Sequence, residues 1–314
     1  ITCGWDRTIK VHMDELVEHK SADQMVKRGK AEAHKKDILC GDYSHNLGLI
    51  ATGGRDNRVR IWEYEKVALQ AELMHNHDIS IVHFIKPFPL LLTSDSDGTV
   101  YIWLTKPHPL HRKCVLSLKN QGIDKVVPVT AIDSFYKEHP DGTPAQLLLL
   151  QGDENGEIVV YDILCVLTLV EGIEKVDITD VAKNPKRNPH REFPIEKEEK
   201  KRSVTRDGND SDNELADSRE NKIEALVNES QIKTVIKKKR VHNDAIRSIQ
   251  YINVTDQPLI LTASFDRLVH LIDFNAQVTG TLKQGYKTML NCHSYMDPKK
   301  SALADSVERQ GRLA

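Results

Sequence analysis

A repeat of 41 residues constrains the fold of this chain more than any other feature of its sequence. Three residue types recur at that spacing and in the same order, which chance rarely produces. The matching pairs are His34 and His75, Asp56 and Asp97, and Trp62 and Trp103. In both copies an isoleucine follows the histidine by four residues. The repeat predicts structural units of about 40 residues.

Each unit predicts two short strands joined by a tight turn. The two clearest copies are IATGGRDNRVRIWEYEK at 50–66 and LLTSDSDGTVYIWLTK at 91–106. Each begins with an apolar run, continues with Gly, Asn and Asp, which tolerate positive φ, and ends with apolar residues at alternate positions. Further strands are expected at 79–85 and 245–252. Several short strands per 40 residues indicate an all-β chain.

The same template locates three further units, at the start of the chain, at 151–162 and at 260–273. The last of these also has a histidine upstream, His242. At the aspartate and tryptophan positions these units carry Asp6 and His12, Asn155 and Tyr161, and Asp266 and Ile272. Four units have a threonine four residues before the aspartate: Thr2, Thr52, Thr93 and Thr262.

With these residues the sequence resembles the WD-repeat β-propeller family. The period, the upstream histidine and the aspartate six residues before tryptophan all match, over about 1–163 and 241–285. The resemblance implies an all-β propeller with about five recognisable blades, the first truncated, and a charged, partly helical insertion. Stacked blades bury faces that a single blade exposes. Because the family commonly has seven blades, we expect the chain to be part of a longer protein.

The resemblance also implies a hydrogen-bonded network inside each blade, running through histidine, threonine, aspartate and tryptophan. The residues assigned to it are His34, Thr52, Asp56, Trp62, His75, Thr93, Asp97, Trp103, His242, Thr262 and Asp266. A His-Asp-Thr set invites comparison with a catalytic triad. This set recurs from blade to blade, as a structural device does and a single active site does not. We therefore expect scaffold residues and no enzyme.

Charge density divides the chain. Residues 183–240 hold 28 charged residues in 58, whereas the other 256 residues hold 62. A stretch this polar buries too little surface to offset chain entropy, so it predicts a disordered or helical insertion. The predicted organisation is blades over 1–182, the insertion at 183–240, a further blade at 241–285 and a tail at 286–314.

The insertion holds the candidate partner contacts. A loose apolar stripe at helical spacing over 214–238 suggests a helix that either lies on its own propeller or docks on another protein. A basic run at 237–240 either ends a connector or acts as a nuclear signal. The candidate contacts are Leu215, Ile223, Leu226, Val227, Lys237, Lys238, Lys239 and Arg240.

Other classes of function find little support in the sequence. The net charge of −2 argues against nucleic-acid binding by bulk charge, and no apolar run approaches the 18 residues of a membrane span. The five cysteines are scattered without a CxxC pair, and the histidines lack zinc-ligand spacing. Residues 207–218 resemble a calcium loop but have Asp212 where glycine is needed. We expect no metal and no cofactor.

These observations predict a non-catalytic scaffold within a larger protein complex. The units at 34–63 and 75–103, with GTLKQG at 280–285, resemble the large WD-repeat proteins of ciliary and flagellar axonemes. That resemblance implies a microtubule-associated protein of the cytoskeleton, with axonemal proteins or tubulin as partners. Tubulin's acidic surface would favour the basic parts of 183–206 and 233–240.

The alternative is a substrate receptor of a ubiquitin ligase or another cytoplasmic regulatory complex. A basic patch at a propeller mouth would take acidic or phosphorylated peptides. The arginines available for such a patch are Arg55, Arg58, Arg60 and Arg267. They could equally be solvated charges on strand faces.

Overall fold

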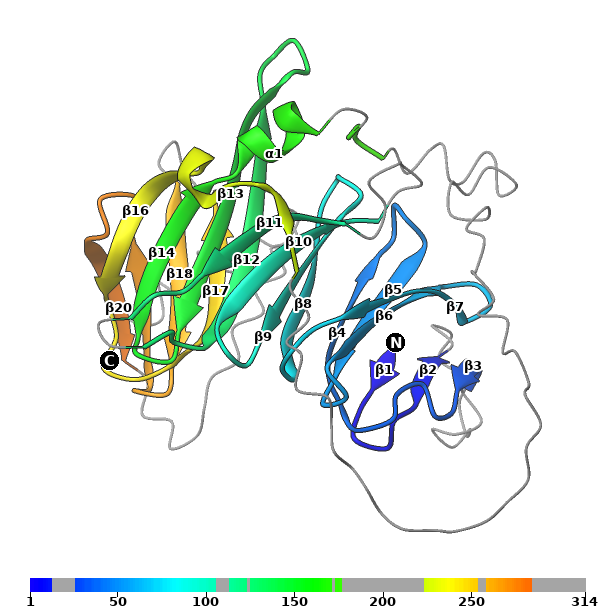
Figure 1. Ribbon diagram of the computed structural model, residues 1–314. Coiled ribbons are helices and arrows are strands. Elements are labelled where there is room, and N and C mark those ends of the chain that lie inside the picture. The colour runs from blue at the N-terminus through cyan, green and yellow to red at the C-terminus, as the bar shows by residue number, and fades with distance from the viewer. Residues whose placement is uncertain are drawn as a thin grey trace, which may run out of the picture.

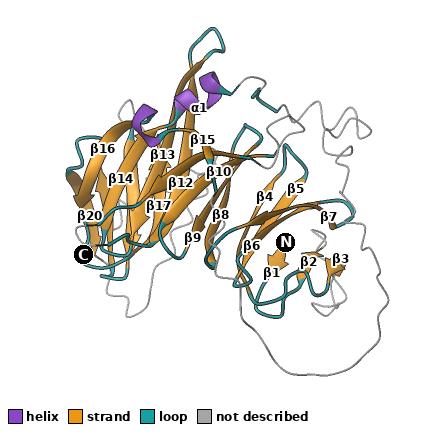
Figure 2. Ribbon diagram, viewed as in Figure 1, coloured by secondary structure: helices purple, strands orange, loops and turns teal. Residues whose placement is uncertain are grey.

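The computed structural model describes residues 1–12, 26–105, 113–122, 125–170, 173–176, 223–253 and 258–283. These residues form five β-sheets, numbered here sheet 1 to sheet 5 in chain order, which fan out side by side (Figure 1). Strands dominate the described residues, among which α1 (Leu164–Leu169) is the one α-helix (Figure 2). The predicted all-β fold of repeated blades is confirmed.

Sheets 1 and 2 are antiparallel meanders in which consecutive strands pair. Sheet 1 contains β1 (Thr2–Cys3), β2 (Ile9–His12) and β3 (Val26–Lys30). Sheet 2 contains β4 (Ile38–Ser44), β5 (Leu49–Gly54), β6 (Arg58–Glu63) and β7 (Ala68–Met74). Thr2 in β1 has the place that Thr52 has in β5, so the described strands of sheet 1 include no counterpart of β4.

Sheets 3 to 5 repeat this meander, except that sheet 3 has one strand added at its outer edge and sheet 4 takes its fourth strand from far along the chain. Sheet 3 contains β8 (Ile79–Ile85), β9 (Leu90–Asp95), β10 (Thr99–Leu104), β11 (Cys114–Lys119) and, beyond β11, β15 (Ala225–Val227). Sheet 4 contains β12 (Val129–Glu138), β13 (Pro144–Asp153), β14 (Glu157–Asp162) and β16 (Lys233–Arg240). Sheet 5 contains β17 (Ile246–Ile252), β18 (Leu259–Ser264), β19 (Leu268–Ile272) and β20 (Val278–Lys283).

The turn after the strand with the threonine position, which Gln151 fills in sheet 4, has the same backbone geometry in all five sheets. One residue in each turn has a left-handed conformation, with φ of 59° at Arg7, 58° at Asn57, 85° at Gly98, 77° at Gly156 and 68° at Arg267. This is the three-residue hairpin loop that ends in a residue with positive φ. The five turns (residues 4–7, 54–57, 95–98, 153–156 and 264–267) lie at the same end of their sheets, which we call the turn face.

Apolar layers hold neighbouring sheets together. Between sheets 2 and 3, for example, Leu49 and Ile61 pack in one buried cluster with Phe84. Corresponding clusters lie between the other neighbouring pairs. Full burial of each large apolar side chain is worth about 1.5–3 kcal/mol, so stacking supplies the stability that a lone sheet lacks.

The first strands of sheets 2 to 5 contact one another in chain order, β4 with β8, β8 with β12, and β12 with β17. Two aspartates bridge these contacts. Asp42 Oδ2 accepts the backbone N–H of Phe84 at 2.7 Å, and Asp133 Oδ2 accepts that of Tyr251 at 2.8 Å. Each carboxylate therefore fixes one sheet to the next, a role that the repeat pattern did not reveal.

The helix predicted over 214–238 is wrong for the residues described there, which begin at Ile223. β15 pairs in parallel with β11, a single 3-10 turn follows at Glu229–Gln231, and β16 pairs with β14. The range assigned to the insertion therefore includes a strand of sheet 3 and a strand of sheet 4. The exposed edge of β14 and the β-branched residues of β16 favour a strand over a helix.

The end of the fan opposite the turn face is crossed by the chain itself. After β14, the residues of α1 pack on the cluster between sheets 3 and 4 through Val166. Val176 then donates its N–H to Pro87 O at 3.0 Å and accepts from Asn46 Nδ2 at 3.1 Å. Lys175 contacts Glu138 on the long β12–β13 hairpin. This segment links the first turns of sheets 2, 3 and 4.

Candidate functional site

The predicted network is complete in sheet 2. His34 bonds Thr52 Oγ1 through Nε2 at 2.8 Å and Asp56 Oδ1 through Nδ1 at 2.9 Å. Trp62 donates its Nε1–H to the same threonine oxygen at 2.9 Å. One set of donors and acceptors satisfies every group. Trp62 donates its indole N–H to the Thr52 oxygen, and the Thr52 hydroxyl donates to Nε2 of His34. His34 then donates its Nδ1–H to the carboxylate of Asp56.

Asp56 is held as a carboxylate. Burial alone would raise its pKa, but hydrogen bonds from His34 and from the backbone of Lys35 lower the pKa to about 2. Gly54 makes room for this pair, because a Cβ there would lie 2.7 Å from His34 Nδ1 and 2.8 Å from Asp56 Oδ1. Arg60 adds a contact of 3.3 Å to the carboxylate. The arrangement is an internal network in which each side chain bonds the next.

Sheet 5 repeats the histidine part of the network. His242 bonds Thr262 Oγ1 at 2.8 Å and Asp266 Oδ2 at 2.9 Å. Ile272 stands where sheet 2 has tryptophan, and His270 stacks on His242 with ring centroids 4.2 Å apart. His270 pairs with Thr262 as Arg60 pairs with Thr52 in sheet 2, so Ile272 alone occupies the tryptophan position.

Sheet 3 departs from the prediction at one residue. His75 bonds Thr93 at 2.9 Å, and Trp103 donates to Thr93 at 2.9 Å, as expected. Asp97, however, lies exposed on the turn, and His75 Nδ1 has no hydrogen-bond partner in the described part of the chain. The assignment of Asp97 to the network is wrong. Burial lowers the pKa of His75 to about 4, so the ring is neutral.

The reason lies two residues earlier. Asp95 occupies the position of Gly54, is buried, and accepts the backbone N–H of Thr99 at 3.0 Å. Asp153 does the same in sheet 4, accepting from Glu157 N at 2.9 Å. These two carboxylates brace their turns from inside and were missed. The sequence did contain a signal for them. Each stands two residues before the turn Asp or Asn, where sheet 2 has a glycine.

Sheet 1 contains a substitute for the tryptophan contact. His12, at the tryptophan position of the template, bonds Thr2 Oγ1 through Nε2 at 2.8 Å. Asp6 accepts both the N–H and the hydroxyl of Thr8, at 3.1 and 2.7 Å. The pairing of the threonine and tryptophan positions thus persists where the residue types change.

The candidate partner contacts in the apolar stripe do not share one surface. Leu215 lies outside the described residues. Ile223 packs on the layer between sheets 2 and 3, and Val227 is buried beside sheet 3. Leu226 is the member with a large exposed fraction, 45%.

The basic run is the end of β16 and is largely engaged within the chain. Lys238 lies 3.0 Å from Asp153 Oδ2, and Lys239 donates to the Ala276 carbonyl at 2.6 Å. Arg240 donates to the carbonyls of His242 and Asn243. Lys237 is exposed. Two of the four arginines considered for an acidic-peptide site, Arg58 and Arg60, likewise pair with Glu72.

The turn face carries exposed apolar side chains. Trp5 is 75% exposed, and Gly4 O accepts the Ile38 N–H at 3.4 Å, which places Trp5 near Leu39 at the start of β4. In sheet 5, Phe265 is 44% exposed and Arg247 lies over its ring at 5.0 Å. Exposed aromatic and arginine side chains are enriched where proteins bind one another.

Within the described ranges, no group of three His, Cys, Asp or Glu side chains is arranged to hold a metal ion. No helix of that part has the length and apolar character needed to cross a bilayer.

Comparison with known proteins finds a WD40 repeat in one segment of the chain. Residues 26–63 match the family model described as WD domain, G-beta repeat. Two similar proteins are Periodic tryptophan protein 2 of Arabidopsis thaliana (28% identical over 41% of this chain) and Probable coatomer subunit beta' of Schizosaccharomyces pombe (27% over 34%). A third is Transcriptional corepressor LEUNIG_HOMOLOG of Arabidopsis thaliana (28% over 40%).

The chain spans a small part of these relatives, 12% of the first and 14% of the other two. Among solved structures, the computationally designed Ika8 protein matches 84% of this chain and 54% of its own, at 14% identity and a TM-score of 0.47. The names of the three relatives describe different kinds of protein.

Proposed function

We propose that this chain is a non-catalytic scaffold that binds other proteins through its turn face. The observation that carries the proposal is the contrast between the two ends of the fan. The turn face exposes Trp5, Leu39 and Phe265, whereas the opposite end is bridged by the chain's own Val176. WD-repeat proteins generally act as interaction scaffolds, which agrees with a blade network that repeats without forming a reaction site.

The face assignment is tested with two variants of the whole chain. Trp5→Ala and Phe265→Ala remove exposed rings and leave the apolar layers intact. A pull-down followed by mass spectrometry should recover fewer partners with these variants than with the parent chain. Leu169→Ala, on α1 at the opposite end and 52% exposed, is the matched control. If the control lost partners and the two variants did not, the interface would lie at the end opposite the turn face, and the proposal would be wrong.

We further propose that the larger assembly is the ciliary or flagellar axoneme. Support comes from the resemblance of residues 34–63 and 75–103 to axonemal WD-repeat proteins. Because Lys238, Lys239 and Arg240 are engaged within the chain, a tubulin contact through this run would depend mainly on Lys237. Recovery of tubulin and dynein-associated proteins is the expected result, and recovery of a cullin with its adaptor would contradict it.

One feature favours the receptor alternative. Arg267 is exposed beside Phe265, and Arg247 covers the same ring, so this corner of the turn face suits an acidic or phosphorylated peptide. Comparing binding of a phosphorylated and an unphosphorylated peptide to the chain and to Arg267→Ala decides between the two. Equal binding of both peptides counts against the receptor function.

A further inference from the structure

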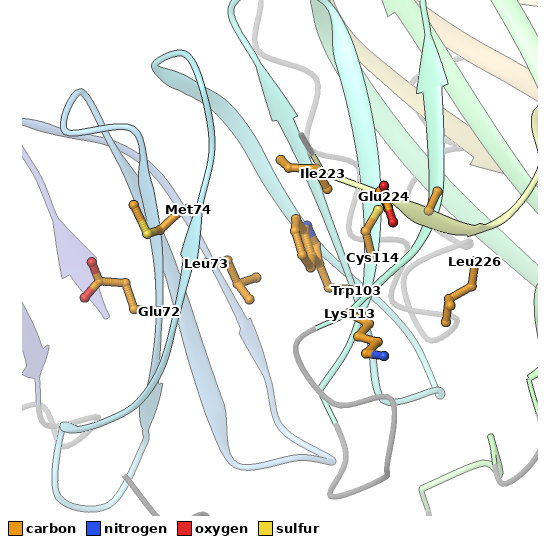
Figure 3. Close-up of a pocket in the computed structure, with 10 residues that line it drawn as sticks. Glu72, Leu73, Met74, Trp103, Lys113, Cys114, Ile223, Glu224 and Leu226 are labelled. Atoms are coloured by element: carbon orange, nitrogen blue, oxygen red, sulfur yellow. The ribbon is translucent and has the colours of Figure 1, made fainter. Parts of the chain in front are cut away.

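A groove of about 460 Å³ lies at the rim of the fan, between the outer strands of sheets 2 and 3 (Figure 3). Leu73 and Met74 of β7 form one wall, and Trp103 and Cys114 of sheet 3 stand opposite. Residues 223–226, at and before β15, complete the lining. The groove has the size of a ligand site and a mostly apolar lining.

The two sheets that face each other across this groove differ by one strand. Sheet 3 has β15 outside β11, whereas β7 is the outermost described strand of sheet 2. Ile223 and Ala225 pack on the apolar layer that the two sheets share. Among the described residues, sheet 2 has no strand opposite β15.

Among the described strands, none pairs with β7 on the side away from β6. His75 N donates to Asn57 O at 2.9 Å, and the register continues with Met74 opposite Arg58 and Glu72 opposite Arg60. In an antiparallel ladder, hydrogen-bonded and non-hydrogen-bonded pairs alternate. The backbone N–H and C=O of Met74 and Glu72 therefore point away from β6. Such an edge is a template for another strand.

We propose that β7 receives an extended segment of another protein as a fifth strand of sheet 2. The added strand would bond the backbone of Glu72 and Met74 and place alternate apolar side chains against Trp103 and Ile223. The neighbouring sheet 3 already contains such an added strand, because β15 pairs with β11 at Cys114↔Ala225 and Leu116↔Val227. In recognition by strand addition, main-chain bonds supply affinity and side-chain pockets supply specificity.

Composition favours a segment of another protein over the chain's own residues 183–222. That range contains few apolar residues, namely Phe193, Ile195, Val204, Leu215 and Ala216. The one stretch in which apolar residues alternate, EFPIE at 192–196, has a proline at its centre, and proline cannot donate a hydrogen bond to a ladder. None of the turn-face side chains Trp5, Leu39 and Phe265 lines the groove, so this proposal does not depend on the function proposed above.

The experiment selects a phage-displayed library of random nine-residue peptides on the whole chain, with counter-selection on Met74→Lys. Enriched peptides should alternate apolar and polar residues. Binding of a selected peptide should weaken about tenfold or more with Met74→Pro, which removes an outward N–H but no bond to β6, and with Leu226→Lys across the groove. Met74→Leu and the distant Leu169→Lys should leave its binding unchanged, and circular dichroism should show all variants folded.

Three outcomes would overturn the proposal. Selection that yields no peptide able to distinguish the chain from Met74→Lys would show that the groove binds no strand. Equal binding by Met74→Pro and Met74→Leu would show that the edge of β7 is not used. Displacement of the selected peptide by a synthetic peptide of residues 183–222 would assign the groove to the chain's own segment.

Discussion

Replacing Thr52 by valine tests whether the blade network stabilises the fold. The substitution keeps the shape of the side chain and removes the one oxygen that meets both Trp62 Nε1 and His34 Nε2. Thr52 is 0% exposed, and Trp62 and His34 are 2% and 1% exposed, so water cannot replace the lost partner. Each buried polar group left without a partner costs about 1–3 kcal/mol, which gives about 2–6 kcal/mol for the pair.

The matched control is Thr2→Val, which breaks the equivalent contact to His12 at an exposed site. Surface changes of this kind usually cost less than about 0.5 kcal/mol. Urea unfolding followed by far-UV circular dichroism gives both values, compared at equal m. Equal losses for Thr52→Val and Thr2→Val would refute the reasoning, because burial would then make no difference to the value of the hydrogen bonds.

Three further predictions concern the aspartate positions. Gly54→Ala should destabilise the chain by about 1–3 kcal/mol in the same assay, because its Cβ would displace His34 from Asp56. Since the pKa of Asp56 is lowered to about 2, the carboxylate stabilises the fold fully above the unfolded pKa near 3.9, and this stabilisation is lost as the pH falls through 2. Asp56→Asn should therefore reduce the dependence of the free energy of unfolding on pH in this acidic range. Asp95→Gly should let Asp97 reach His75, which would raise the pKa of His75 from about 4. An unchanged titration of the His75 imidazole, followed by NMR, would contradict this.

The repeat pattern was sufficient to predict the blades and the threonine positions. Thr52, Thr93 and Thr262 each bond the expected histidine, because their spacing from the turn fixes their place on the strand. The same pattern failed at Asp97. Two aspartates compete for one turn there, and the sequence does not show which carboxylate points inward. Only the buried position of Asp95, set by the stacking of sheet 3, decides it.

The segment that was expected to be helical shows a second limit. Its apolar residues fit a helical stripe as well as a strand, and its charge density suggested a solvated insertion. The decisive influence is distant: β14 offers an edge, and β16 completes sheet 4 with Ile236 buried against sheet 5. The ion pair between Lys238 and the buried Asp153 likewise depends on a pairing between residues far apart in sequence.

The position of β16 far along the chain from β14 affects how the chain folds. In sheet 2 the third and fourth strands are a few residues apart, whereas in sheet 4 about 70 residues separate β14 from β16. Closing the longer loop costs about 2 kcal/mol more entropy, so during synthesis sheet 4 stays incomplete until residue 240 has emerged. A single engineered protease cut in 183–222 would leave two polypeptides joined by the β14–β16 ladder and by the parallel pairing of β15. The propeller would then behave as a split protein, with halves that separate only on denaturation.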